Sequence, residues 1–371
     1  MTMRRTARIA IVGGGLAGLY AAHLLEHKGI HNYVVLEARD GWGGRIASTP
    51  AVAGGAPQDH FDLGPTWFWP DYQPQLDHLI DSLGLKRFAQ SEDGDMVVER
   101  APDGAPVRMR VSLASPPSMR LEGGMGALVD ALRLGLASGN LMLGQRVQRL
   151  HCDGHHVEVD AEDAQGQSSL YQVEHVLLAV PPRLALALIG FSPLLPESLI
   201  RAWRGTATWM APHAKYLALY DEPFWRAQGL SGEARSTRGP LGEIHDASMP
   251  GGGAALFGFF GVPGHVRRGV PEDVLRAYCR AQFTRLFGER AAAPKADFIK
   301  DWAADPWTAT NADQDGPGRH GMAPPANAAE GVWKKHITGI ASEWSSQFPG
   351  YLAGAIEAAT NGINTILDQR T

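Results

Sequence analysis

The sequence has few cysteines, no long hydrophobic run and no strong excess of charge. Cys152 and Cys279 are the only cysteines among 371 residues, so no disulfide framework is predicted. No segment approaches the roughly 18 consecutive apolar residues of a membrane-spanning helix, so we expect no membrane partner. A net charge of −5 gives no electrostatic reason to expect nucleic acid as a partner. The first predicted strand begins by residue 7, which leaves no room for a signal peptide, and we expect a cytoplasmic protein.

The most informative segment is a glycine-rich motif between two predicted strands. Residues 9–12 form a short apolar run, which predicts a buried strand. Three glycines follow in the GxGxxG spacing, namely Gly13, Gly15 and Gly18. This spacing allows a tight turn, close approach of backbone to a pyrophosphate, and a helix whose N-terminus faces the phosphates. A second strand, 33–36, ends in Glu37, whose carboxylate is placed to accept ribose hydroxyls, so a dinucleotide-binding fold is predicted.

A second glycine-rich segment follows Glu37 directly and bears on which dinucleotide is bound. Gly43 and Gly44 allow close backbone approach, and Arg45 adds a charge partner for phosphate. The block LEAR followed by GGR resembles the flavoprotein amine oxidase family, which includes monoamine and polyamine oxidases. The resemblance implies that these residues, with Arg39, hold FAD. The alternative is a surface turn with solvated arginine.

The segment FDLGPTWFWP at residues 61–70 is similar to the family segment that passes beside the flavin ring. The resemblance implies that Gly64 and Thr66 contact the cofactor and that Trp67 faces the substrate cavity. Three aromatic residues in a stretch bounded by proline are also typical of core packing, and that alternative stays open.

Residues 213–220 are predicted to form a strand on which Lys215, Leu217 and Leu219 share one face. A lysine in apolar company either extends its ammonium to solvent or is held in a cavity, and the spacing alone favours the first. The segment AKYLALYDEPFWR closely resembles the family segment whose lysine bonds through a water to flavin N5. The resemblance therefore implies a catalytic role for Lys215.

Later blocks of the chain also follow the family pattern. The cofactor contacts that these blocks imply are made by Val147, Trp307, Glu343 and Leu352. The block GYLAGAI at residues 350–356 implies a helix whose N-terminus faces the flavin pyrimidine ring. Tyr351 then stands where the family has one of two tyrosines that enclose the substrate amine.

Two local patterns need no functional explanation. Asp153 and Gly154 predict a hairpin turn, and the histidines and cysteine around it match no standard zinc spacing, so no metal is expected. Residues 183–204 are predicted to be helical.

The sequence departs from the monoamine oxidase pattern after residue 306. It has no cysteine there to link the flavin, so we expect FAD to be bound non-covalently. Ala312 stands where the second cage tyrosine would fall, so the cage is incomplete or is completed by another residue such as Trp67 or Trp344. The related L-amino-acid oxidases carry an arginine beside the LGP segment to hold the substrate carboxylate, and its absence here favours amines as substrates.

These observations predict an α/β protein with two domains. We expect a discontinuous Rossmann-type FAD-binding domain at residues 1–85, 119–205 and 304–371. A second, mixed-sheet α+β domain at residues 86–118 and 206–303 is expected to bind the substrate.

The predicted reaction is FAD-dependent oxidation of a small-molecule amine, with hydride transfer to flavin N5, an imine product, and reoxidation by O2 giving H2O2. Lys215, Tyr351 and Trp67 are the predicted catalytic residues. One alternative is a desaturase or dehydrogenase that passes electrons to an acceptor other than oxygen. Another is a flavin-binding protein without amine turnover.

Overall fold

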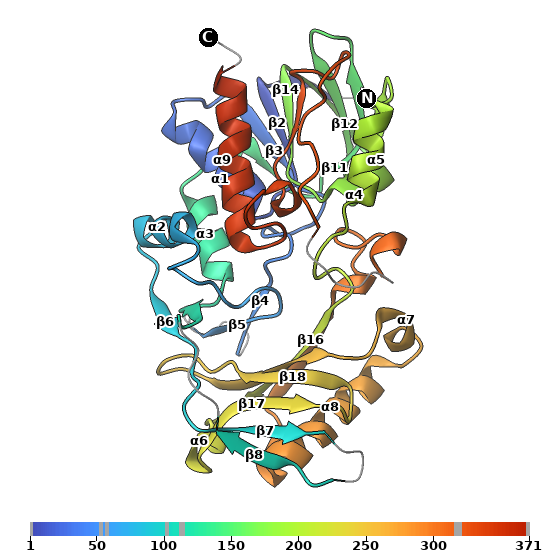
Figure 1. The fold of residues 1–371 in the computed structure, drawn as a ribbon. Coiled ribbons are helices and arrows are strands. Elements are labelled where there is room, and N and C mark those ends of the chain that lie inside the picture. Colours follow the sequence, from blue (N-terminus) through green and yellow to red (C-terminus); the bar gives the residue numbers. More distant parts are fainter. Residues whose placement is uncertain are drawn as a thin grey trace. The chain divides into compact units, whose positions relative to one another are not determined.

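The structure is a computed structural model that describes residues 3–51, 55, 59–100, 104–110, 116–314 and 321–368. The chain forms two compact units, which are coloured along the sequence in Figure 1. The first unit comprises Met1–Arg45, Val129–Ala211 and Pro306–Thr371, and the second comprises Ile46–Leu128 and Pro212–Asp305. No helix in the described part of the chain is both long and apolar enough to cross a membrane.

The first unit is built on a five-stranded parallel sheet with the order β10-β3-β2-β14-β21. Its strands are β2 (Ile9–Val12), β3 (Tyr33–Leu36), β10 (Leu141–Met142), β14 (His175–Leu178) and β21 (Ile337–Gly339). Every residue of β2, β3 and β14 is buried, as expected for parallel strands covered on both faces. Two helices, α1 (Leu16–His27) and α9 (Leu352–Asp368), lie side by side and pack together (Figure 1).

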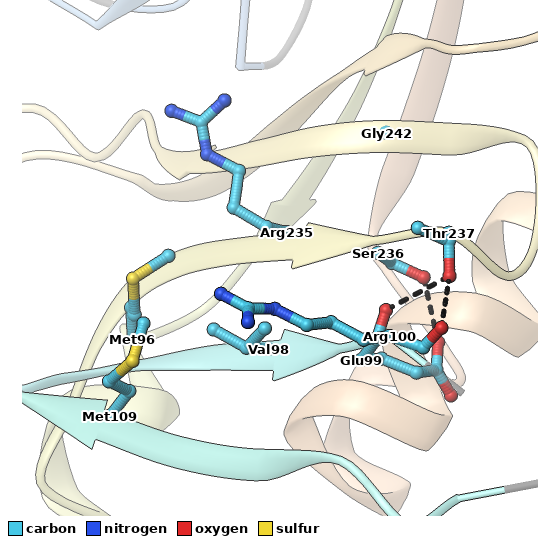
Figure 2. Close-up of a pocket in the computed structure, with 9 residues that line it drawn as sticks. All are labelled: Met96, Val98, Glu99, Arg100, Met109, Arg235, Ser236, Thr237 and Gly242. Carbon is cyan, nitrogen blue, oxygen red and sulfur yellow. Dashed lines mark hydrogen bonds between the residues drawn. The ribbon is translucent and has the colours of Figure 1, made fainter.

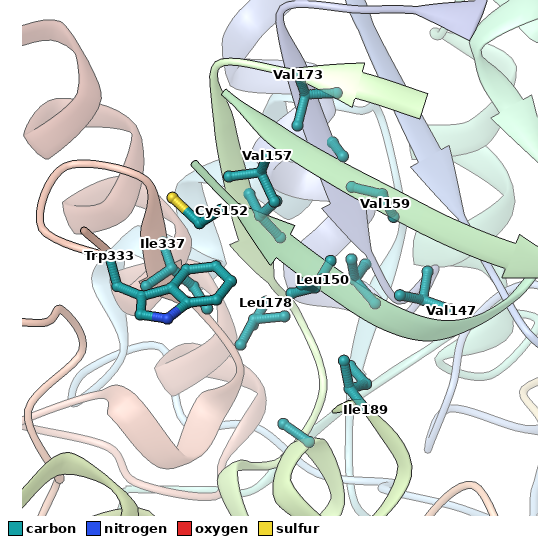
Figure 3. Packing of buried hydrophobic residues seen from close by; sticks show 14 of the residues in the cluster. Val147, Leu150, Cys152, Val157, Val159, Val173, Leu178, Ile189, Trp333 and Ile337 are labelled. Carbon is teal, nitrogen blue, oxygen red and sulfur yellow. The ribbon is translucent and has the colours of Figure 1, made fainter. Parts of the chain in front are cut away.

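A second five-stranded sheet of this unit has the order β1-β13-β12-β11-β15. Its strands are β1 (Met3–Thr6), β11 (Arg146–Cys152), β12 (Val157–Glu162), β13 (Ser168–Val173) and β15 (Gly190–Ser192). The remaining helices described in this unit are α4 (Pro182–Leu188), α5 (Glu197–Gly205), and the 3-10 turns η1 (Ser138–Asn140), η4 (Asn311–Asp313) and η5 (Ser342–Trp344). Figure 3 shows how the alternate apolar residues of β11 and β12 pack with Trp333 and Leu178 into one core.

The second unit contains a seven-stranded mixed sheet with the order β20-β16-β19-β18-β17-β7-β8. Its strands are β7 (Asp95–Glu99), β8 (Val107–Arg110), β16 (Ala214–Tyr220), β17 (Leu230–Ser236), β18 (Leu241–Asp246), β19 (Ala254–Phe260) and β20 (Ala296–Asp301). Helix α8 (Glu272–Phe287) covers one face, where Phe283 packs edge-on against Tyr216. Side chains alternate along a strand, so Lys215 lies on the opposite face.

Short elements complete the second unit. They are β4 (Ser48–Pro50), β5 (His60–Asp62), β6 (Arg87–Ala89), β9 (Met119–Leu121), α2 (Pro74–Ser82), α6 (Phe224–Ala227), α7 (Gly264–Arg267), η2 (Glu289–Ala291) and η3 (Trp302–Ala304). The boundary between the units falls within α3 (Gly126–Leu134).

The predicted α/β class, with a Rossmann-type domain and a mixed-sheet second domain, is confirmed. The single helix expected over residues 183–204 is wrong, because the short strand β15 separates α4 from α5. Pro193 and Pro196 lie between the two helices, and proline lacks the N–H that a continuous helix needs. The compact units differ from the predicted domains at 46–85, 119–128 and 304–305, which belong to the second unit, and at 206–211, which belong to the first. The assignment of FAD binding to one domain and of substrate binding to the other stays a prediction.

Candidate functional site

Gly13 in the turn from β2 to α1, and Gly18 in the first turn of α1, leave no room for a side chain. Gly13 has φ +109°, and a Cβ built there would lie 2.8 Å from the carbonyl oxygen of Ala179. A Cβ on Gly18 would lie 2.0 Å from the carbonyl oxygen of Gly13, far inside van der Waals contact. Helix α1 can therefore approach β2 this closely only with glycine at position 18.

The N-terminus of α1 has no side-chain cap among the residues that the structure describes. Its N-cap residue is Gly15, which has no side chain to donate or accept. Gly15 instead faces the second glycine-rich segment, where it forms an isolated β-bridge with Gly43. A Cβ on Gly44 would lie 3.2 Å from the Cα of Gly15. The fold thus brings the turn at Gly15 and the second glycine-rich segment together beside the N-terminus of α1. The free N–H groups of a helix N-terminus favour an anion.

Glu37 lies beside this turn and is only 4% exposed. Its Oε2 accepts the backbone N–H of Gly14 at 2.6 Å, and its Oε1 accepts the backbone N–H of Arg39 at 2.9 Å. A carboxylate has about four acceptor positions, so each oxygen keeps capacity for a further donor such as a hydroxyl. Nearby, the backbone N–H of Gln145 donates to the carbonyl of Glu37, while its side-chain Oε1 is buried without a partner in the described part of the chain.

Two arginines of the second glycine-rich segment donate hydrogen bonds to residues of the C-terminal part of the chain. Arg45 donates to both carboxylate oxygens of Glu343, at 2.6 Å and 3.0 Å, and to the Ser342 hydroxyl at 3.1 Å. Arg39 donates to the buried hydroxyl of Thr308 at 3.1 Å. The structure therefore joins Arg45 and Glu343, which the sequence singled out separately.

The other predicted cofactor residues of the first unit take their places on regular elements. Val147 is buried on β11, beside a bulge in its pairing with β12. The ring of Trp307 lies 5.7 Å from the guanidinium of Arg146. Leu352 begins α9, directly after Tyr351.

Sequence reasoning missed an aromatic partner of Tyr351. The rings of Trp209 and Tyr351 lie 5.0 Å apart, tilted by 43°, and both residues are half-buried. Gly350 has φ +85°, and a Cβ there would lie 3.0 Å from the Cβ of Trp209. Trp209 lies in the connection after α5, where no motif marks it, so only the fold reveals the pairing.

In the second unit, Lys215 is held inside the protein and is 2% exposed. Its ammonium donates to the carbonyl of Asp62 at 3.1 Å, the carbonyl of Gly64 at 2.7 Å and the hydroxyl of Thr66 at 2.7 Å. The alternative in which Lys215 extends to solvent is wrong. The fold thus brings together Gly64, Thr66 and Lys215, three predicted site residues.

Lys215 belongs to a buried charge cluster with Asp62 and Arg120. Burial and, to a smaller extent, the positive charge of Arg120 lower the pKa of Lys215. The negative charge of Asp62 acts in the other direction, and the resulting pKa is about 7. Burial also raises the pKa of Asp62, although Lys215, Ser48 and Arg120 act in the other direction. The Oδ2 of Asp62 and the Nε of Arg120 make no hydrogen bond within the described chain.

An aromatic cluster made of Trp67, His245, Phe257 and Phe259 lies next to Lys215. The Lys215 Nζ is 4.2 Å from the ring centroid of Phe257 and 5.4 Å from that of Phe259. Trp67 is half-buried and is oriented by a hydrogen bond from its Nε1 to the Oε1 of Gln90 at 2.8 Å. Core packing explains Phe68, which is fully buried, better than it explains Trp67.

A small pocket of about 220 Å³ lies on β7, β8 and β17 and is lined by side chains that include Arg100 and Arg235 (Figure 2). Ligand pockets usually begin at roughly 300 Å³. None of the predicted site residues lines this pocket, so we assign it no function.

Comparison with known proteins identifies the family. Residues 100–362, which are most of the chain, match the model of the flavin-containing amine oxidoreductases, and residues 11–83 match an NAD(P)-binding Rossmann-like domain. The chain belongs to the flavin-containing amine oxidoreductase family. This amine oxidoreductase is a flavin-dependent enzyme with FAD as its cofactor.

Two of its relatives are distant in sequence but match over most of their length. It is 25% identical to a probable flavin-containing monoamine oxidase A of Dictyostelium discoideum, over 97% of each chain. It is 23% identical to the putrescine oxidase of Kocuria rosea, over 81% of this chain and 83% of that one. A solved putrescine oxidase structure covers 99% of this chain, and this chain covers 100% of it, with a TM-score of 0.81 and 20% identity. The solved structure of the cyclohexylamine oxidase from Brevibacterium oxydans IH-35A matches with a TM-score of 0.78 and 19% identity. The match covers 98% of this chain and 99% of that one.

The first unit of this amine oxidoreductase has the features that FAD requires. The uncapped α1 terminus suits a pyrophosphate, and the spare acceptor positions of Glu37 suit ribose hydroxyls. The Oε1 of Gln145, buried and without a partner among the described residues, is an acceptor that a hydrogen-bond donor of such a ligand would satisfy.

The two cysteines and Trp344 of this amine oxidoreductase lie in hydrophobic cores. Cys152 and Cys279 are 2% and 0% exposed. Trp344 is 6% exposed and packs edge-on against Trp203, with ring centroids 5.3 Å apart. This packing favours Trp209 over Trp344 as the aromatic neighbour of Tyr351.

Proposed function

We propose that this protein oxidises a small-molecule amine at the carbon that bears nitrogen. The match of residues 100–362 to the amine oxidoreductases is the observation that carries the proposal, and the buried Lys215 supports it. Bound FAD would supply the redox chemistry, a two-electron oxidation of the amine to an imine that water hydrolyses, with O2 as the proposed acceptor that is reduced to H2O2.

The proposed cofactor contacts lie in both units. In the first unit Gly13, Gly15 and Gly18 admit the pyrophosphate, Glu37 accepts the ribose hydroxyls, and further contacts come from Arg39, Gly44, Arg45, Val147, Trp307, Glu343 and Leu352. In the second unit the contacts come from Gly64 and Thr66. Both cysteines are packed in hydrophobic cores, and we propose that FAD is bound non-covalently.

Lys215 is proposed to act through its hydroxyl partner. A lysine ammonium has three N–H groups, and all three are donated within the unit. Thr66 accepts one of them and keeps its own proton to donate. A water that serves the reaction is therefore oriented through the Thr66 hydroxyl.

Aromatic side chains are proposed to select the substrate. Tyr351 with Trp209 in the first unit, and Trp67 in the second, offer apolar ring surface to an amine. Desolvation by such rings favours the neutral form of the amine. The segment around Trp67 has no arginine for a carboxylate, so amines are favoured over free amino acids.

The first experiment is an anaerobic titration of the purified protein. Primary amines, secondary amines and polyamines are added in turn while the visible band of the flavin is followed. Bleaching by one class supports amine oxidation and names the substrate type. A flavin that stays oxidised with every amine, yet is reduced by dithionite, overturns the proposal.

A dehydrogenase that uses another electron acceptor is the second candidate. One relative, 26% identical over 68% of this chain and 52% of its own, is named an L-amino acid dehydrogenase of Synechocystis. Fast reduction by substrate, combined with slow reoxidation in air and rapid reoxidation by a quinone, favours this candidate over an oxidase.

A further inference from the structure

A histidine and a glutamate lie on the sheet face that carries Lys215. Strand pairing aligns Lys215 of β16 with Phe259 of β19, and Phe259 with Glu243 of β18. The next row aligns Leu217 and Phe257 with His245. Directly paired residues point to the same face of a sheet, so Glu243 and His245 share the face of Lys215.

The carboxylate of Glu243 orients the imidazole of His245. The Nε2 of His245 lies 2.7 Å from the Oε1 of Glu243. Burial acts to raise the pKa of Glu243, but the hydrogen bond from His245, the charge that His245 carries when it is protonated, and the ion pair with Arg235 outweigh burial, and the pKa falls below its usual range. An ionised carboxylate can only accept, so the neutral imidazole carries its proton on Nε2 and has a lone pair on Nδ1.

The Nδ1 of His245 is available to a ligand. It makes no hydrogen bond to any described residue, and the side chain is 12% exposed. The imidazole meets Trp67 edge-on, with ring centroids 4.8 Å apart, and lies 5.4 Å from Phe257. A free acceptor nitrogen therefore lies within the aromatic cluster, beside the residue proposed to contact the substrate.

We propose that His245 is the base that takes the proton from the incoming alkylammonium substrate. This inference rests on the proposed function. One N–H bond of the ammonium breaks and its electron pair stays on nitrogen, giving the neutral amine that oxidation requires. The proton binds to Nδ1, so the positive charge moves to the imidazole. Glu243 acts as a positioning residue that fixes the tautomer and stabilises the imidazolium.

Charged side chains of the neighbouring strands also lie on this face. Glu243 lies on the same strand, and Arg235 and Glu233 lie on β17, where Arg235 pairs with both carboxylates. Strand β19 contributes only the phenyl rings of Phe257 and Phe259, and Lys215 lies beyond them on β16. Glu243 is thus the carboxylate in direct contact with the imidazole.

The first test is the pH dependence of anaerobic flavin reduction in the FAD-loaded protein. His245→Phe keeps the packing against Trp67, and His245→Gln provides a second variant. We expect both variants to reduce their flavin about a hundredfold more slowly than the wild type at pH 7.5. Near pH 10.5 about half of a free alkylamine is already neutral, so the rates should converge to within about threefold. His155→Gln, on an exposed turn, should match the wild type throughout.

The second test counts protons and needs no turnover. Calorimetry at pH 8 in buffers of different ionisation enthalpy follows binding of an amine that has no hydrogen on the carbon bearing nitrogen. We expect the wild type to release almost no proton to the buffer. His245→Phe should release about one proton for each amine bound, and Glu243→Gln should fall between them.

The outcomes separate the two proposals. An equal loss of rate at every pH, no loss at pH 7.5, or one proton released by the wild type overturns the role of His245 while amine oxidation stands. A wild-type flavin that no amine bleaches overturns amine oxidation, and the role of His245 with it.

Discussion

The ammonium of Lys215 lies 2.7 Å from the hydroxyl of Thr66, in a part of the second unit where Lys215 is only 2% exposed. A buried ammonium is costly unless its N–H groups are all accepted. Here two carbonyl oxygens and one hydroxyl accept them, and the carboxyl of Asp62 is close enough to oppose the loss of charge. The segment from Asp62 to Thr66 is therefore fixed to β16 by the side chain of Lys215, which couples this proposed catalytic residue to the residues proposed to contact the cofactor.

Replacing Lys215 with methionine tests this coupling. Lys215→Met keeps the length and apolar stem of the side chain but removes three hydrogen bonds. We expect flavin reduction by amine to slow about a hundredfold, because the Thr66 hydroxyl loses its donor. Lys300→Met is the matched control. Lys300 lies on β20, where it is the strand-pairing neighbour of Lys215, but its ammonium donates to the carboxylate of Asp305. Stopped-flow reduction at the wild-type rate in Lys215→Met would remove this lysine from the mechanism.

The lowered pKa of Lys215 also predicts how stability depends on pH. The folded-state pKa is about 7, whereas the ordinary value is 10.5. Between these values the unfolded chain binds a proton that the folded chain does not, so this group makes the unfolding free energy rise with pH. Below pH 7 both states are protonated and the cost of the buried charge is fully present. Where Lys215 is fully protonated in the unfolded chain and fully neutral in the folded chain, the unfolding free energy rises by about 1.4 kcal/mol per pH unit.

Denaturant unfolding at pH 7, 8 and 9 with saturating FAD measures this dependence. The unfolding free energy of the wild type minus that of Lys215→Met should rise by about 1 kcal/mol per pH unit. A difference that is constant over this range would mean that Lys215 stays charged in the folded protein.

The glycine-rich blocks could be interpreted from sequence because their geometry is local. The spacing of Gly13, Gly15 and Gly18 encodes the strand, turn and helix that the structure has. The position of Lys215 within an apolar strand could not decide between solvent and interior. Its three acceptors come from residues about 150 positions earlier, and only the tertiary fold brings them near.

Other site features depend wholly on long-range packing. Trp209 meets Tyr351 because the connection after α5 passes the start of α9, and neither residue's neighbours in sequence signal this. The alternation of Glu243 and His245 on a strand was visible, but their alignment with Lys215 requires the order and register of three strands. The break between α4 and α5 was foreseeable in part, since Pro193 and Pro196 disfavour a continuous helix.

Glu37 provides a test of cofactor affinity that is separate from catalysis. Glu37→Gln replaces one acceptor oxygen with a donor group, which faces a backbone N–H of Gly14 or Arg39. We expect FAD to bind about tenfold to a hundredfold more weakly, because hydrogen bonds to a charged group contribute about 1.5–3 kcal/mol. Quenching of FAD fluorescence on titration of apoprotein gives the dissociation constant. Glu330→Gln on the exposed surface is the control, and equal affinities for the two variants would contradict the role of Glu37.

Changing Gly18 to alanine is expected to lower the stability of the fold, whereas changing Gly15 to alanine is expected to weaken FAD binding. A Cβ on Gly18 would lie 2.0 Å from the carbonyl oxygen of Gly13, which is backbone and cannot move alone. Gly18→Ala should therefore destabilise the first unit by about 3 kcal/mol or more. A Cβ on Gly15 would lie 3.6 Å from the nearest atom, the carbonyl oxygen of Gly43, and φ at Gly15 is −77°, which alanine adopts readily.

Gly15→Ala should consequently melt within about two degrees of the wild type but bind FAD about tenfold more weakly, because the added methyl lies where backbone must approach the pyrophosphate. Gly41→Ala, in the second glycine-rich segment, is the control, since a Cβ there has no neighbour within 4 Å, and it should change neither quantity. Melting of the apoprotein and FAD titration separate the two effects. Wild-type affinity in Gly15→Ala would mean that the pyrophosphate does not approach this turn, whatever the effect of Gly18→Ala.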